Sequence, residues 1–180
     1  NFDNFTGAAT AFNRGGQGFD RLGIHYTTPS FSGAQAYVSY HPDNNGTDGG
    51  ADTNNLVFSG DDMFAVGATY NRDFDGFGIG LPAGYPAIQG RGDAFTLGAN
   101  VSVSGFTVAG TYQNEDPDVG ATGELFTIGL QYSNGPITVG GGYAHADNGT
   151  GGVLAAGGEE EELVGWLTYA LAPGVSATAG

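Results

Sequence analysis

Residues 93–103 read Asp93-Ala94-Phe95-Thr96-Leu97-Gly98-Ala99-Asn100-Val101-Ser102-Val103. From Phe95 onward every second residue is apolar, and the residues between them are small or polar. This alternation is typical of a β-strand with one apolar and one polar face. After Gly105 it resumes in the opposite parity at Phe106 and Val108, which is the shift expected where a tight turn joins the two strands of a hairpin.

The same alternation recurs along the whole chain and predicts about ten strands. We expect them at roughly 21–29, 34–42, 62–72, 76–82, 93–103, 106–114, 124–133, 136–146, 162–171 and 175–180. Short Gly-containing turns should alternate with long loops at 43–61, 82–92, 115–123 and 147–161. Short turns at one end and longer loops at the other are typical of transmembrane barrels. We therefore predict an all-β fold, a transmembrane antiparallel β-barrel.

The composition is rich in glycine and acid. The 180 residues include 35 Gly, 19 Asp and Glu, four Arg and no Lys, with a formal net charge of −15. A nucleic-acid-binding protein is excluded because phosphate binding needs clustered cations. Small residues on the second face of the strands cannot fill a narrow barrel, which packs its interior with larger side chains. The glycine content therefore favours a wide, water-filled interior.

Seven of the nine tyrosines fall on the apolar face of the predicted strands, in two bands. One band, near the short turns, comprises Tyr26, Tyr70, Tyr132 and Tyr169; the other, near the long loops, comprises Tyr40, Tyr112 and Tyr143. Tyrosine is enriched at both water interfaces of a membrane, because its ring is apolar and its hydroxyl stays hydrated. A soluble core has no need for two such bands, so the pattern favours a membrane barrel.

The segment from Phe19 to Gly33 resembles a strand and turn of the general diffusion porins of Gram-negative bacteria, in particular the alphaproteobacterial, Rhodobacter-like type. Tyr26, Pro29, Phe31 and Gly33 match an Arg-Tyr-x-x-Pro-x-Phe-x-Gly run of that family, and His25 stands where the family often has Arg. The resemblance implies a 16-stranded, trimeric barrel in the bacterial outer membrane. Residues 1–180 would be an internal fragment of one barrel domain, with 1–20 ending the pore constriction loop and 21–180 supplying about ten strands.

A barrel of this kind is expected to pass small hydrophilic solutes and ions by passive diffusion, without a required cofactor. Its excess of acid implies a mild preference for cations, and its partners would be outer-membrane lipid and lipopolysaccharide. The pore-lining and constriction candidates are Asp3, Arg14, Asp20, Arg21 and His25. Arg72, beside a short turn, fits either the lumen or the headgroup region.

Fourteen of the 19 acidic residues fall at the end that carries the long loops. Clustered carboxylates suit Ca²⁺, which takes six to eight oxygen ligands. The candidate ligands are Asp61, Asp62, Glu159 and Glu160. The alternative is a solvated acidic surface whose charges hold the loops apart.

Other functions have less support in the sequence. Residues 15–22 match one calcium β-roll repeat, but no second copy follows, and stacked sites need several. The chain has no His-Glu-x-x-His, phosphate-loop or Gly-x-Ser-x-Gly motif, so we predict that it is not an enzyme. Two alternatives stay open: an outer-membrane adhesin or structural barrel with a plugged lumen, and a soluble calcium-binding β-protein.

Overall fold

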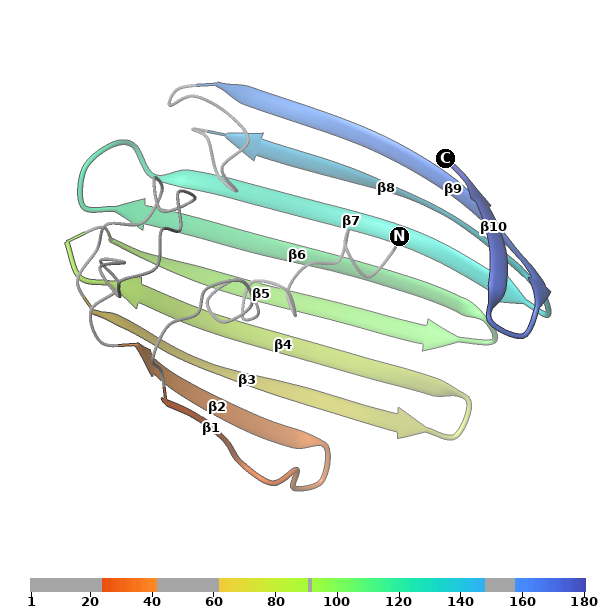
Figure 1. The fold of residues 1–180 in the computed structure, drawn as a ribbon, viewed down its shortest axis with the longest axis horizontal. Helices are drawn as coiled ribbons and strands as arrows, with labels where there is room; N and C mark the ends of the chain where they lie inside the picture. The colour runs from red at the N-terminus through yellow and green to blue at the C-terminus, as the bar shows by residue number, and fades with distance from the viewer. Residues whose placement is uncertain (1–23, 42–61, 91, 148–157) are drawn as a thin grey trace.

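The part of the chain that the structure describes forms one antiparallel β-sheet of ten strands, in which each strand pairs with its neighbours in the chain (Figure 1). The computed structural model describes residues 24–41, 62–90, 92–147 and 158–180. The strands are β1 (Ile24–Thr27), β2 (Ala34–His41), β3 (Met63–Phe74), β4 (Phe77–Ile88), β5 (Gly92–Val103), β6 (Phe106–Pro117), β7 (Gly123–Asn134), β8 (Ile137–Asp147), β9 (Glu159–Ala172) and β10 (Val175–Ala179). The predicted all-β, antiparallel fold is confirmed.

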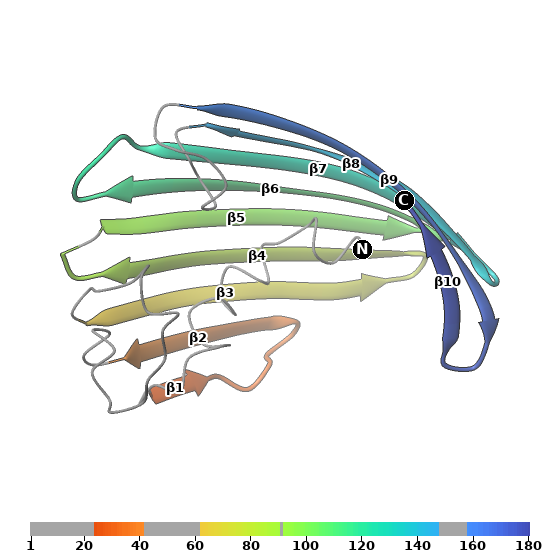
Figure 2. The same cartoon turned by 45° about the horizontal axis from the view of Figure 1, so that its top comes forward.

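The sheet is strongly curved, and its last strands bend away from the plane of the middle ones (Figure 2). β1 and β10 are its two edges, and no pairing joins them among the described residues. None of the described residues forms a helix long and apolar enough to cross a membrane.

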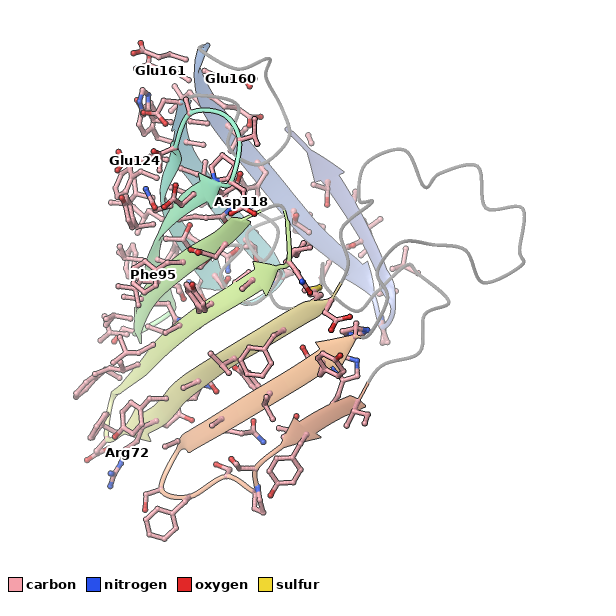
Figure 3. The ribbon with its side chains drawn as sticks, turned by 90° about the vertical axis from the view of Figure 1, so that its left-hand side faces the viewer. Arg72, Phe95, Asp118, Glu124, Glu160 and Glu161 are labelled. Atoms are coloured by element: carbon pink, nitrogen blue, oxygen red, sulfur yellow. The ribbon has the colours of Figure 1, made fainter. Side chains whose placement is uncertain are left out.

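The register divides the side chains cleanly between two faces. Leu97 lies opposite Tyr112, which lies opposite Phe126, and this face is apolar and exposed. Thr111 and Thr127 lie opposite each other on the second face and are only 7% exposed. The apolar face is on the outer, convex side of the curve, where Arg72, Phe95, Glu124 and Glu161 project (Figure 3). We call the two sides the convex face and the concave face.

The turns at one end of the sheet explain part of the glycine content. Ser32 and Gly33 have φ angles of 50° and 91°, and Ser104 and Gly105 have 49° and 85°. Two central residues with positive φ make a type I′ turn, whose twist matches that of the flanking strands and which favours glycine. A Cβ atom at Gly105 would lie 2.5 Å from the carbonyl oxygen of Ser133 on the neighbouring strand. Glycine is therefore required there by both conformation and space.

Two of the predicted long loops are wrong. β4 continues to Ile88 and β6 to Pro117, so the connections at this end shrink to residues 89–91 and 118–122. The sequence obscured β4 because Pro82 and Pro86 normally exclude a central strand. In the structure β4 pairs with β3 throughout, but its pairing with β5 is interrupted at residues 81–82 and 85–86. Proline has no backbone N–H to donate to a neighbouring strand. Pro82 and Pro86 lie where β4 and β5 are not paired, so no hydrogen bond from either proline to β5 is required.

The other two long loops fall mostly outside the described residues. β9 begins at Glu159, inside the loop predicted at 147–161. The predicted constriction-loop segment 1–20 also lies outside the described residues, as does the first part of the strand expected at 21–29. We call the end with residues 89–91 and 118–122 the loop end, and the opposite end the turn end.

Candidate membrane interface and pore wall

All seven tyrosines predicted to border a membrane lie on the convex face. Tyr26, Tyr70, Tyr132 and Tyr169 are toward the turn end, and Tyr40, Tyr112 and Tyr143 are toward the loop end. Between the two bands the face carries Val, Ile, Leu and Ala. From Phe95 to Val103 the strand covers about 27 Å at ~3.4 Å per residue. This length is comparable with the apolar band of about 25 Å on outer-membrane barrels.

At the loop end each tyrosine is paired with a carboxylate. The Tyr40 hydroxyl donates to Asp62 Oδ2 at 2.7 Å, and the Tyr112 hydroxyl donates to Glu124 Oε1 at 2.7 Å. On the next hairpin, the Tyr143 hydroxyl donates to Glu161 Oε1 at 3.0 Å. A hydrogen bond to an ionised oxygen is stronger than one between neutral groups. In each pair the tyrosine ring lies on the apolar face, and its hydroxyl binds a carboxylate at the loop-end border of that face.

The pairs share one geometry, a diagonal across the hairpin. Tyr112 faces Phe126 directly, and its carboxylate partner lies two residues before that phenylalanine. Tyr143 faces Leu163, and its partner also lies two residues earlier. Diagonal neighbours on one face of a sheet are within reach of long side chains. The same arrangement of a tyrosine, the apolar residue opposite it and an acid two residues nearer the loop end therefore recurs on these hairpins.

Sequence reasoning missed a fourth member of this set. Tyr85 interacts with Asp93 across the β4–β5 connection, two strands from each neighbouring pair. It lies inside the segment 82–92, for which the sequence predicts a long loop. One sequence signal could have found it. Near the start of four strands an acidic residue stands two positions before Phe or Leu, and these pairs are Asp62 and Phe64, Asp93 and Phe95, Glu124 and Phe126, and Glu161 and Leu163.

The turn end has a different chemistry on the same face. The rings of Phe106 and Tyr132 lie 4.4 Å apart, centroid to centroid. Arg72 faces Ile79, and its guanidinium lies 5.3 Å from the centre of the Phe74 ring. Arginine can lay its stem along apolar surface while its charged head reaches water. Of the two positions that the sequence left open for Arg72, the structure has the convex face, not the lumen side.

The concave face consists mainly of small residues and residues with hydroxyl groups. Thr111 and Thr127 share a hydrogen bond of 2.7 Å between their hydroxyls. Nearer the loop end, Gln113 donates to the carboxylate of Glu115. Glu160 and Glu162 lie on the same face, because they face Ala146 and Ala144 of β8. The only Arg or Lys among the described residues, Arg72, is on the convex face.

Of the pore-lining candidates, only His25 is described. It faces Ser39 on the concave side, and its ring lies 4.8 Å from that of His41 in an edge-to-face arrangement. Its assignment to the pore lining stays a prediction. The remaining candidates, Asp3, Arg14, Asp20 and Arg21, lie outside the described residues.

The predicted calcium ligands are not brought together. Asp62 accepts the hydrogen bond of Tyr40, and Asp61 lies outside the described residues. Glu159 faces Asp147 on the convex side, whereas Glu160 faces Ala146 on the concave side. In the described part of the chain, no three His, Asp or Glu side chains gather as metal ligands. The geometry gives calcium no support at these positions.

Comparison with known proteins identifies the fold and the family. A model of the Gram-negative porins matches residues 1–180, and no protein with a curated description matches. A Rhodobacter porin refined at 1.8 Å resolution superposes with a TM-score of 0.63 at 18% identity, over 89% of this chain and 55% of that porin. The chain thus spans about half the length of the solved structure. The predicted relation to the general porins is confirmed, and the chain belongs to the Gram-negative porin family, whose members are outer-membrane channels and not enzymes.

Proposed function

We propose that this chain forms part of a water-filled channel through which small hydrophilic solutes and ions diffuse passively across the outer membrane. The observation that carries this proposal is the division of one sheet into two chemically opposite faces. The convex face is apolar and bordered by tyrosines at both ends, as a lipid-facing surface requires. The concave face carries polar side chains that are not buried, among them Gln113, Glu160 and Glu162, which suits contact with water.

The charges of the concave face support a preference for cations. Glu115, Glu160 and Glu162 lie on it, and their field acts on ions in the adjacent water. Salt screens exposed charges beyond about 10 Å at 0.1 M, so the preference is mild in a wide pore. Asp3, Arg14, Asp20, Arg21 and His25 remain the proposed constriction residues, because the family resemblance assigns the preceding segment to the infolded loop.

The assembly and surroundings follow from the family and stay proposals. A homotrimer is proposed on the resemblance to trimeric porins. Lipopolysaccharide and phospholipid are the proposed surroundings of the convex face, because its two tyrosine bands match the height of an apolar layer. Calcium at the acidic loop end is retained only as a minor proposal, since dense negative charge at a membrane surface favours divalent counterions.

Reconstitution of the full-length protein that contains this chain tests the function. In planar bilayers we expect stepwise increases in conductance, and in a salt gradient a reversal potential of the sign that marks cation preference. A protein that inserts and resists denaturation but conducts no ions would support a plugged barrel instead. A protein that stays soluble without detergent would contradict the membrane assignment.

A further inference from the structure

Two polar side chains on the concave face, near the turn end, converge over one glycine. Asp73 of β3 and Ser102 of β5 lie directly opposite Gly78 of β4, one on each side of it. A Cβ atom at Gly78 would lie 2.8 Å from Asp73 Oδ1 and 2.7 Å from Ser102 Oγ. Both oxygens therefore lie over the same Cα atom, and a larger residue than glycine would displace them.

The next row toward the loop end has a similar arrangement with an amide. Asn100 of β5 lies opposite Gly80 of β4. A Cβ atom at Gly80 would lie 2.9 Å from Asn100 Oδ1, so the amide covers this glycine. Both glycines are buried in the sheet beneath these side chains. A carboxylate, a hydroxyl and an amide are thereby held on one small area of the concave face.

The fold does not use the oxygens of Asp73 and Ser102. Asp73 is exposed and Ser102 is half-buried. Among the described residues, neither side chain has a hydrogen-bond or ion-pair partner. Two oxygens that met only to stabilise the sheet would hydrogen-bond each other, as those of Thr111 and Thr127 do at 2.7 Å. The lone pairs of Asp73 and Ser102 are therefore available to a ligand.

The chemistry of these three groups indicates the class of ligand. Carboxylate, hydroxyl and amide oxygens are hard ligands, which suit hard cations. Ca²⁺ takes six to eight oxygens, with carboxylates prominent among them, and one carboxylate with two neutral groups falls short of that. Arg72, the residue before Asp73, projects from the opposite face of the sheet (Figure 3). The set fits a monovalent cation that keeps part of its water shell.

We propose that Asp73, Ser102 and Asn100 form a weak binding site for monovalent cations on the channel wall near the turn end. The cation lies over Gly78 between Asp73 Oδ1 and Ser102 Oγ, and the Asn100 amide borders it on the loop side. The inference rests on the proposed function, because it requires the concave face to border the water-filled passage. It adds a second cation position to the acidic loop end, at the opposite end of the wall.

Potassium ions are the probe, and single-channel conductance of the full-length protein is the measurement. Recordings run over a range of KCl concentrations that begins below about 0.1 M, where exposed charges are screened only beyond about 10 Å. Because the site holds potassium ions in the passage, conductance should saturate with rising KCl rather than follow bulk conductivity. The absence of any conductance would overturn the proposed function together with this site.

Three variants separate a binding site from a general effect of charge. Asp73→Asn should raise the half-saturating KCl concentration about tenfold, because it removes a charged ligand. Asp75→Asn removes the same charge two residues later, in the β3–β4 turn, and should change it little. Ser102→Ala leaves the charge unaltered and should raise it about two- to fivefold, as the loss of one hydrogen-bonding oxygen predicts.

Three results would overturn the site while the channel itself stands. Equal effects of Asp73→Asn and Asp75→Asn would show that only the net charge of the turn end acts. An unchanged half-saturating concentration in Ser102→Ala would show that the hydroxyl is not a ligand. A block of the potassium current by millimolar Ca²⁺ that Asp73→Asn removes would show a divalent site and contradict the monovalent assignment.

Discussion

The hydroxyl of Tyr112 on β6 donates a 2.7 Å hydrogen bond to Glu124 on β7, diagonally across the hairpin at the loop end. The same diagonal joins Tyr40 to Asp62 and Tyr143 to Glu161. The repeat fixes the boundary of the lipid-facing surface, because each ring lies on the apolar side of its bond and each carboxylate on the wet side. No corresponding carboxylate pairs are found among the described residues of the turn end, where Arg72 stacks on Phe74.

Removing the Tyr112 hydroxyl should weaken this boundary without removing the ring. Tyr112→Phe is expected to lower the denaturant midpoint of the folded barrel slightly, and Tyr112→Ala is expected to lower it more, because it also deletes the apolar ring. Urea titrations in lipid vesicles, followed by the electrophoretic shift of the folded form, measure both. Tyr132→Phe is the matched control, since the contact of Tyr132 in the structure is a tilted ring contact with Phe106, which the substitution keeps. A larger loss in the control than in Tyr112→Phe would contradict the role of the diagonal bond.

The hydroxyl pair of Thr111 and Thr127 should show strong coupling. Both residues are 7% exposed, and their oxygens are 2.7 Å apart. Thr111→Val leaves a buried hydroxyl without its partner, which costs about 1–3 kcal/mol of unfolding free energy. The double variant with Thr127→Val should recover part of that loss, because no polar group is then stranded. A double-mutant cycle in urea measures the coupling, and strictly additive losses would show that the pair does not act as a unit.

Replacing the glycine of the β5–β6 turn, Gly105, should destabilise the fold more than replacing the glycine of the β3–β4 turn, Gly76. Gly105 and Gly76 both have positive φ, at 85° and 96°. A Cβ at Gly105 meets the Ser133 carbonyl oxygen, whereas nothing lies within 4 Å of a Cβ at Gly76. Gly76→Ala should therefore cost about 1–2 kcal/mol from backbone strain alone, and Gly105→Ala should cost more. Equal losses in unfolding free energy would show that the close approach to Ser133 is relieved without cost.

Neighbouring glutamates on β9 should differ sharply in their effect on ion selectivity. Glu160 and Glu162 lie on the concave face, and Glu159 and Glu161 on the convex face. The double variant Glu160→Gln/Glu162→Gln should move the reversal potential in a salt gradient toward zero. Glu159→Gln/Glu161→Gln removes the same charge from the same strand and should change the potential much less. If both double variants shift it equally, the acidity of the loop end as a whole sets selectivity, and not the wall.

The two faces of the sheet could be predicted almost completely from the sequence. Successive side chains of a strand point to opposite faces, so once a strand is recognised the face of every residue in it follows. Thr96 and Leu97 illustrate this: the register places them on the concave and convex faces, as their alternation predicts. The strand ends were predicted less well. Pro82 and Pro86 look like strand breakers in the sequence, and only the pairing shows that their missing donors fall where β4 and β5 are not bonded.

The candidate site was harder to predict than the fold. Tyrosine bands follow from position along a strand, but diagonal partners depend on register, so the pairing of Tyr112 with Glu124 could not be read from spacing within one strand. The contact of Trp166 with Gly140 was missed for the same reason. Its opposite residue, Gly140, lies 26 positions earlier in the chain, and only the β8–β9 register brings the two together.

The central claim is that the concave face borders water and the convex face borders lipid, and cysteine accessibility tests it most directly. The chain contains no cysteine, so single cysteines introduced along β5 report without background from this region. In vesicles holding the full-length protein, Asn100→Cys and Ser102→Cys should react rapidly with a charged, water-soluble thiol reagent. Leu97→Cys and Val101→Cys should react slowly with it and should be quenched by a lipid-dissolved probe. Equal reactivity at all four positions, or the reverse order, would contradict the account.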